Sequence, residues 1–419
     1  MKDVLFVTYF WPPSGKATIH WPLGVIRRLE ESGWRASVLT VENEGFERKD
    51  ESMLARVPEE VEVVRARAWE PFDLYRKALG KKKGEPLVAS ETVSKEDAGL
   101  VKRLTMEIRM QLFVPDARAG WYPYAVKAGG KLMERKKFDA IVTIGPPHTA
   151  HLVGRSLAKR SGIPYFPVFV DPWTDIVYYR DFWRNPLTRA VDRRFERKTV
   201  EDAAGVVFVT DTTRRDFAER YPNEREKYRT LYWGYDGEAF PEFDEKPKRE
   251  KKRLLHAGNI FDYQNPTAFW RRLARERDEG RLGEIRFVGT VSPGVRRAVG
   301  EAGLTPIAKY LGFLPYREAA REMIEADWLL ACVTEPRHVP GKLFEYLRAE
   351  GKIVAFGDEN EEAASIIRDA NAGVLSPYAS DGDEFFRRID EFKTDREFVA
   401  KFDRREIARG LARLLEEKS

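Results

Sequence analysis

Cysteine is almost absent from this sequence: Cys332 is the only one among 419 residues. A single cysteine excludes a disulfide within the chain and a zinc site built from cysteines, and we interpret Cys332 as a buried strand residue. Long apolar stretches are also missing, and none approaches the roughly 20 residues that a membrane-spanning helix needs. The N-terminal run at residues 4–8 is too short for a signal peptide. We therefore expect a cytoplasmic protein whose contact with the inner face of the plasma membrane, if any, is peripheral.

The sequence also lacks two widespread nucleotide-binding signatures. Its first expected strand, residues 4–8, runs into the turn YFWPPSGK at residues 9–16 and then into an amphipathic helix. This turn has neither the GxGxxG pattern of dehydrogenases nor the Walker loop of P-loop ATPases. Gly15 leaves room for a ligand phosphate at a helix start, but an ordinary strand-to-helix turn explains the glycine equally well.

Charge of one sign is not in large excess. The 73 basic and 68 acidic residues leave a net charge of +5, without the blocks of basic residues that a nucleic-acid binder needs. We therefore expect no nucleic-acid partner. The segment 77–110 is predicted to be a mobile insertion. Its basic run 77–83, with Lys102, Arg103 and Arg109, forms either a basic surface for peripheral contact with an anionic membrane or a solvated face.

What the sequence does contain is a regular alternation of apolar runs with amphipathic segments. Continuous apolar runs separated by helices are typical of parallel sheets in doubly wound α/β folds. The strands predicted for the first half are residues 4–8, 36–39, 140–144, 165–170 and 205–209. The strands predicted for the second half are residues 253–257, 285–288, 308–311, 328–333, 353–356 and 372–375.

A charged, proline-containing stretch separates the two series of strands. We predict an N-terminal Rossmann-like domain over residues 1–238, a linker over 239–252 and a second Rossmann-like domain over 253–385. Residues 386–419 are predicted to form helices that can cross back to the first domain. Folds of this kind bind their ligands at the carboxyl ends of the strands, so we expect the site there.

Two strand ends in the first half carry polar side chains. The segment GPPHTAH at residues 145–151 presents His148, which can donate to a substrate hydroxyl or titrate near neutrality. His151, one helical turn further on, is interpreted as a packing residue. Asp171, in the segment DPWTD, either orients a substrate hydroxyl or caps the following helix.

The most informative segment is HVPGKLFEYL at residues 338–347. Here a glycine turn enters a helix whose first turn is expected to carry Lys342 and Glu345. Backbone amides and the Lys342 ammonium suit a diphosphate, and the Glu345 carboxylate can accept hydrogen bonds from both hydroxyls of a ribose. The alternative is an ordinary Pro-Gly turn with a glutamate near a helix start.

In chain order, the segments PPSG, GPPH, DPWT and PGKLFEYL resemble the family-4 retaining glycosyltransferases of the GT-B fold, especially the bacterial members associated with surface polysaccharide synthesis. The resemblance covers almost the whole chain, and its specific parts are PGKLFEY and GPPH. It implies catalytic roles for His148, Asp171 and Lys342. It also implies a nucleotide-sugar donor bound by Gly15, Gly258, Asn259, Gly289, Thr290, Phe313, Leu314, Pro340, Gly341, Lys342, Leu343 and Glu345.

The sequence departs from the family pattern at three places. Arg337 stands where the first glutamate of the family's paired-glutamate motif would fall. The loop after Gly258 reads NIFDYQN and lacks the arginine and lysine that the family often places there for the diphosphate, so Lys342 is expected to take over that contact. Trp233 replaces the asparagine that is common before the interdomain linker.

The resemblance implies transfer of a sugar from the nucleotide donor to a carbohydrate or lipid-linked acceptor, with retention of configuration and without a metal or other cofactor. Two alternatives remain open, and the departures from the pattern favour the second. One is a nucleotide-sugar epimerase of the same fold, which would convert the donor without an acceptor. The other is a non-catalytic partner subunit. The sequence does not indicate the donor base, the donor sugar or the acceptor.

Overall fold

The computed structural model describes residues 1–42, 49–69, 111, 113–175, 184–243, 246 and 248–418. The chain forms two compact units. Unit 1 comprises Met1–Tyr232 together with Ala408–Ser419, and unit 2 comprises Trp233–Ile407. The predicted insertion 77–110, with the basic residues for which membrane contact or a solvated face was expected, lies outside the described residues.

Unit 1 is built on a seven-stranded sheet in the order β3-β2-β1-β4-β5-β6-β7. Every pair of neighbouring strands is parallel, as the continuous apolar runs predicted. The strands are β1 (Lys2–Thr8), β2 (Trp34–Val41), β3 (Glu62–Ala66), β4 (Ala140–Gly145), β5 (Tyr165–Phe169), β6 (Val206–Phe208) and β7 (Tyr228–Thr230).

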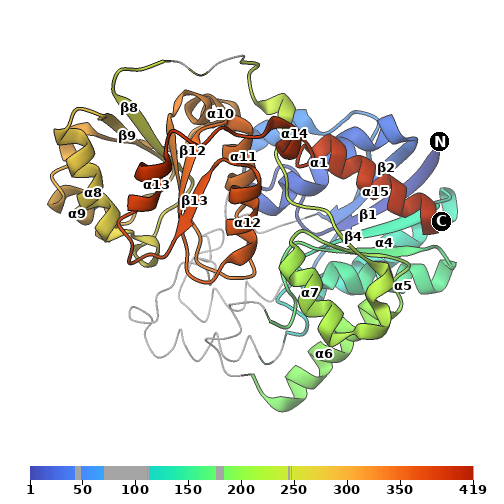
Figure 1. The fold of residues 1–419 in the computed structure, drawn as a ribbon. Helices are drawn as coiled ribbons and strands as arrows, with labels where there is room; N and C mark the ends of the chain where they lie inside the picture. The colour runs from blue at the N-terminus through green and yellow to red at the C-terminus, as the bar shows by residue number, and fades with distance from the viewer. Residues whose placement is uncertain are drawn as a thin grey trace, which may run out of the picture. The chain divides into compact units, whose positions relative to one another are not determined.

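Helices connect these strands and cover both faces of the sheet (Figure 1). The α-helices are α1 (His20–Leu29), α4 (Tyr122–Arg135), α5 (Thr149–Ser161), α6 (Pro186–Glu201), α7 (Asp211–Arg220) and α15 (Arg404–Lys418). Short 3-10 helices are η1 (Ala17–Ile19), η2 (Glu30–Ser32), η3 (Glu51–Arg56), η5 (Ala119–Trp121) and η7 (Pro222–Lys227). Helix α15 begins in unit 2 and ends in unit 1.

The core of unit 1 follows from the alternation of side chains along each strand. Leu5 and Val7 of β1 belong to one apolar cluster with Leu132 of α4 and Leu157 of α5. Phe6, between them in sequence, is also fully buried but is not part of that cluster. Burial on both faces explains why the sequence of β1 reads as one apolar run.

Unit 2 contains a six-stranded sheet in the order β10-β9-β8-β11-β12-β13, again with parallel neighbours. Its strands are β8 (Lys252–Ala257), β9 (Leu282–Val288), β10 (Ala308–Gly312), β11 (Trp328–Cys332), β12 (Lys352–Phe356) and β13 (Gly373–Ser376). Its α-helices are α8 (Thr267–Asp278), α9 (Pro293–Glu301), α10 (Tyr316–Glu325), α11 (Gly341–Ala349), α12 (Glu361–Asp369), α13 (Asp383–Arg388) and α14 (Arg396–Ala400). Three 3-10 helices complete it: η8 (Gly237–Ala239), η9 (Asp262–Gln264) and η10 (Thr305–Ile307).

The predicted fold class is confirmed, because each unit is a doubly wound α/β domain with a parallel sheet. Two strands, β3 and β7, were not predicted, and both lie at edges of the seven-stranded sheet. Among the described residues, no helix is both long and apolar enough to span a membrane.

Candidate functional site

In unit 2, the residues expected to bind a donor gather at one edge of the sheet. The carboxyl ends of parallel strands meet at the same edge, and each of four strands is followed there by expected residues. Gly258 and Asn259 follow β8, Gly289 and Thr290 follow β9, Phe313 and Leu314 follow β10, and the start of α11 with Pro340, Gly341, Lys342 and Leu343 follows β11.

Two glycines and a lysine form the centre of this edge, which we call the glycine–lysine cradle (Gly258, Gly289 and Lys342). Gly258 and Gly289 have backbone φ angles of +102° and +106°, which residues other than glycine rarely adopt. A Cβ added to Gly258 would lie 2.9 Å from Nζ of Lys342, and one added to Gly289 would lie 2.6 Å from the Gly258 carbonyl oxygen. Only glycine lets these backbone segments and the Lys342 ammonium come this close.

Among the described residues, no carboxylate forms an ion pair with Lys342, although the charge of Glu345 acts on it from beyond ion-pair distance. Nζ of Lys342 lies 3.5 Å from Nε2 of His256, and burial, together with the Lys342 charge, lowers the pKa of His256 to about 3. Burial raises the pKa of the Cys332 thiol to about 12, so both neighbours are neutral at pH 7. Burial also lowers the pKa of Lys342 itself. An anion bound here would relieve that cost.

The start of α11 completes the cradle with backbone donors. Pro340 is the N-cap, Gly341 is the first helical residue, and the first N–H groups of a helix have no partner within it. The Leu343 N–H donates a hydrogen bond of 2.9 Å to the Pro340 carbonyl, and the Leu343 side chain is fully buried. A Cβ on Gly341 would lie 2.5 Å from the indole of Trp233, so Trp233 packs directly against this helix start.

Glu345 lies on the second turn of α11, because the helix begins at Gly341 and its first turn contains no acidic residue. The expectation that Glu345 belongs to the first turn was therefore wrong. Its Oε1 accepts a hydrogen bond of 2.7 Å from the hydroxyl of Tyr316, the first residue of α10. Tyr316 was not singled out from the sequence.

The remaining residues of unit 2 expected at the donor site line the same edge. Oδ1 of Asn259 accepts a hydrogen bond of 3.1 Å from the Thr290 N–H, which joins the loops after β8 and β9. Phe313 is 61% exposed and Leu314 is half-buried. An exposed aromatic ring at a strand end provides an apolar surface on which a planar base can stack.

In unit 1, His148 and Asp171 follow the neighbouring strands β4 and β5. His148 is buried, and its ring stacks on that of Trp173 with centroids 4.6 Å apart and an angle of 5°. Within the described residues, neither ring nitrogen makes a hydrogen bond of normal geometry. Burial lowers the pKa of His148 to about 3, although the Pro172 backbone opposes this shift. The expectation that His148 titrates near neutrality was therefore wrong, and the ring is neutral at pH 7.

His151 is fully buried, and its Nδ1 lies 2.7 Å from the Thr143 hydroxyl of β4. It therefore joins helix α5 to the sheet, as a packing residue does. Gly15 lies in the loop between β1 and η1, ahead of the start of α1 at His20. Among the described residues, no group of three or more histidine, cysteine or acidic side chains has the arrangement of a metal site.

Two acidic residues of α6, one turn apart, hold the loop that carries Asp171. Oδ1 of Asp192 accepts a hydrogen bond of 2.7 Å from the Trp173 indole. The Glu196 carboxylate accepts bonds from the Thr174 N–H and hydroxyl at 2.9 and 3.0 Å. Both carboxylates are fully buried. The i, i+4 spacing of two acids on a helix could have indicated these two residues from the sequence, but no pattern indicated the loop that they hold.

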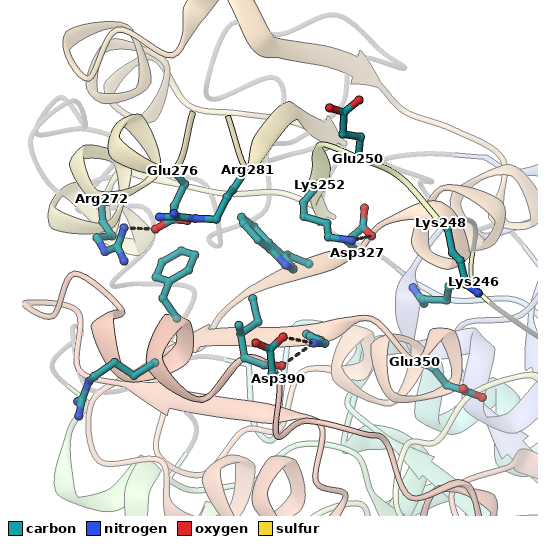
Figure 2. A pocket seen from close by; sticks show the side chains of 15 residues that line it. Lys246, Lys248, Glu250, Lys252, Arg272, Glu276, Arg281, Asp327, Glu350 and Asp390 are labelled. Atoms are coloured by element: carbon teal, nitrogen blue, oxygen red, sulfur yellow. Dashed lines mark hydrogen bonds and ion pairs between the residues drawn. The ribbon is translucent and has the colours of Figure 1, made fainter. Parts of the chain in front are cut away.

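A pocket of about 610 Å³ lies at the opposite edge of the sheet in unit 2. Lys252, Trp328 and Lys352, which begin β8, β11 and β12, line it. Figure 2 shows Lys252 beside Asp327, and their charged atoms are 3.3 Å apart. This pocket therefore lies at the amino ends of the strands, away from the glycine–lysine cradle.

Comparison with known proteins identifies a family and a fold. Residues 23–234 match the family model described as "Glycosyl transferase 4-like domain". No curated protein matches the chain in sequence.

Solved structures resemble the whole chain. HepE of Anabaena, in complex with UDP, is 13% identical with a TM-score of 0.62, and 100% of each chain is covered. Sucrose-phosphate synthase from Thermosynechococcus elongatus is 12% identical with a TM-score of 0.61, and 100% of this chain and 99% of that chain are covered. The lipopolysaccharide outer core galactosyltransferase WaaB is 12% identical with a TM-score of 0.60 and full coverage of both chains. At these identities the likeness concerns the fold, which is GT-B.

Proposed function

Because the chain belongs to the glycosyl transferase 4-like family, we propose that it transfers a sugar from a nucleotide-sugar donor to a carbohydrate or lipid-linked acceptor with retention of anomeric configuration. The observation that carries this proposal is the glycine–lysine cradle at the carboxyl edge of the sheet in unit 2. Gly258 and Gly289 let neighbouring groups come close to the backbone, Lys342 supplies a positive charge, and helix α11 starts beside them. These are the elements that bind a diphosphate.

The proposed chemistry depends on stabilising the departing nucleoside diphosphate. As the bond between the anomeric carbon and the diphosphate oxygen breaks, negative charge develops on that oxygen. The Lys342 ammonium and the first N–H groups of α11 would stabilise this charge, and fixed donors of this kind contribute most in a site of low polarity. Glu345 would accept hydrogen bonds from the ribose hydroxyls. We propose that the reaction proceeds without a metal or another cofactor.

His148 and Asp171 are proposed to contact the sugar or the acceptor. Because the pKa of His148 is about 3, its neutral ring can donate or accept a hydrogen bond but does not act as a general acid at neutral pH. The half-buried Asp171 carboxylate is proposed to orient a hydroxyl of the substrate.

UDP is the first nucleotide to test, because the structurally similar HepE of Anabaena is described with UDP and with UDP-glucose. A role in surface polysaccharide synthesis is proposed from the sequence resemblance and from the similarity in fold to an outer core galactosyltransferase. We also propose that the protein works in the cytoplasm and uses nucleotide sugars there as donors.

A thermal-shift screen against UDP, GDP, ADP and their common sugar conjugates tests the donor site. We expect one nucleotide to raise the melting temperature selectively, because ligand binding to the folded state stabilises it. Glu345→Ala should remove most of that shift. No shift with any nucleotide would contradict a donor site and favour the non-catalytic partner subunit. Conversion of a nucleotide sugar without an acceptor would favour the epimerase.

Gly258→Ala tests the cradle directly. The added methyl would lie 2.9 Å from Nζ of Lys342, so we expect the ammonium to be displaced and the affinity for UDP to fall by about tenfold or more. The matched control is Gly280→Ala, since Gly280 also has a positive φ, +75°, but nothing lies within 4 Å of its added Cβ. Both variants should lose about 1–2 kcal/mol of stability from backbone strain. Equal UDP affinities in the two variants, measured by calorimetry, would argue against the cradle.

A further inference from the structure

The Glu345 carboxylate is held by a residue from another element of unit 2. One carboxylate oxygen, Oε1, accepts the 2.7 Å hydrogen bond from the Tyr316 hydroxyl at the start of α10. In the part of the chain that the structure describes, no residue donates a hydrogen bond to the other oxygen, Oε2. Glu345 itself is only partly buried. One oxygen is therefore anchored and the other is available.

Arg404, the first residue of α15, supplies a buried positive charge near Glu345. Its side chain is 1% exposed, and its Nη2 makes a long contact of 3.4 Å with the Gly234 carbonyl. Its Nε and Nη1 have no hydrogen-bond partner among the described residues. A buried guanidinium with unused donors is costly unless negative charge compensates it. The carboxylates that interact with it electrostatically include Glu345.

The protonation of Glu345 is set by opposing effects. Burial raises its pKa, and the nearby carboxylate of Asp236 adds to the rise. The Tyr316 hydrogen bond and the positive charges of Arg404 and Lys342 lower it. An ionised carboxylate accepts hydrogen bonds from two ribose hydroxyls, whereas a protonated one has lost part of that capacity. Together these effects leave the pKa of Glu345 above its ordinary value, and the interactions with Tyr316, Arg404 and Lys342 limit that rise.

We propose that Tyr316 and Arg404 are positioning residues of the donor site: Tyr316 anchors Oε1 of Glu345, and the buried Arg404 guanidinium supplies positive charge to the surroundings of this carboxylate, so that Oε2 accepts a hydrogen bond from the ribose. This inference rests on the proposed function, because it assigns partners to the glutamate that would bind the donor. Tyr316 fixes the carboxylate through the hydroxyl, and Arg404 acts through its charge. Neither residue needs to touch the nucleotide.

A double-mutant cycle with Tyr316→Phe and Glu345→Gln tests this inference, with UDP as the probe in calorimetry at pH 7.5. Tyr316→Phe keeps the ring and removes only the hydroxyl, and we expect it to weaken UDP binding by about three- to tenfold. If Tyr316 acts through Glu345, the same change should have little effect in the Glu345→Gln background. Tyr310→Phe, which removes a hydroxyl from half-buried Tyr310 of β10 in the same unit, is the control and should bind UDP as the wild type does.

The pH dependence of UDP binding gives a second readout, which a merely structural role would not move. Ionised Glu345 is needed, so affinity should fall as the pH drops through the pKa of this carboxyl. Tyr316→Phe removes an interaction that lowers this pKa, so in this variant the loss should begin at a higher pH than in the wild type. The UDP phosphates also ionise, near pH 6, and this affects every variant alike. Because glutamine does not titrate, the pH dependence that remains in Glu345→Gln is the part that comes from the phosphates.

Arg404 is tested with a pair of variants. Arg404→Met removes the charge and should raise the pH at which binding is lost, whereas Arg404→Lys retains a charge and should restore part of the wild-type profile. Should both Arg404 variants fail to fold, the Tyr316 cycle still decides the matter. If the wild type binds no nucleotide, the proposed function fails and this inference falls with it. If the wild type and Glu345→Gln behave as expected but Tyr316→Phe has the affinity and pH profile of the wild type, the inference alone is overturned.

Discussion

Replacing Lys342 with alanine is expected to reduce sugar transfer by about a hundredfold or more and to weaken UDP binding by about tenfold. Lys342, at the start of α11, places its ammonium close to Gly258, where charge would develop on the leaving diphosphate in the proposed reaction. Removing one fixed donor from such a position costs about 2.7–4 kcal/mol in the transition state. The expected loss is therefore larger in turnover than in binding, and steady-state kinetics with the donor identified by the thermal-shift screen measures both.

Two further variants make the Lys342 result specific. Lys309→Ala removes an exposed lysine of β10 that pairs with Glu284, and it should leave both parameters unchanged. Lys342→Arg keeps a positive charge and should retain part of the binding. Because burial lowers the pKa of Lys342, wild-type affinity should decline as the pH rises through that pKa, and the arginine variant should not show the decline. Unchanged turnover and donor affinity in Lys342→Ala would show that the assignment of this residue is wrong.

Glu196→Ala is expected to have the largest effect on stability, a loss of about 3–5 kcal/mol in the free energy of unfolding. The carboxylate is fully buried and accepts hydrogen bonds from Arg220 and Tyr221, each at 2.7 Å, besides the two from Thr174. Its removal would leave partly buried donors without their acceptor and would free the loop that carries Asp171. Chemical denaturation followed by tryptophan fluorescence measures the change.

Glu201→Ala is the matched control on the same helix. Glu201 is partly exposed and pairs with Lys198 at 2.7 Å, and surface pairs of this kind contribute little. The expected change is within about 0.5 kcal/mol. A loss of similar size in both variants would mean that the buried bonds of Glu196 do not stabilise unit 1.

The strands that could be predicted from the sequence are those buried on both faces. β1 and β4 are covered by helices on either side and so read as continuous apolar runs. β3 reads EVVRA and β7 reads YRT, and both lie at sheet edges, where one side has no neighbouring strand and polar residues are tolerated. Their sequences carry no apolar run, so the periodicity that revealed the other strands missed them.

Only the part of the candidate site that lies directly after strands could be predicted from the sequence. The loops after β8 and β9 and the start of α11 could be placed together because parallel strands share a carboxyl edge. The contact between Tyr316 and Glu345 joins two helices, and Arg404 comes from the far end of unit 2 in sequence. Contacts between elements that are far apart in the sequence are set by packing, and the periodicity of apolar residues does not encode them. The neutral state of His148 was missed for the same reason, since its burial depends on the stacked Trp173.

Helix α15 has a practical consequence for dissecting the protein. It starts at Arg404 in unit 2, but its residues from Ala408 onward belong to unit 1. There Leu411 and Leu415 are fully buried, and a Cβ added to Gly205 would lie 3.0 Å from the Leu414 side chain. A fragment that stops at Tyr232 would therefore lack part of its own apolar core and expose the face that α15 covers. No single cut separates this chain into two independently folding halves, and an isolated unit 1 would need its C-terminal helix grafted back.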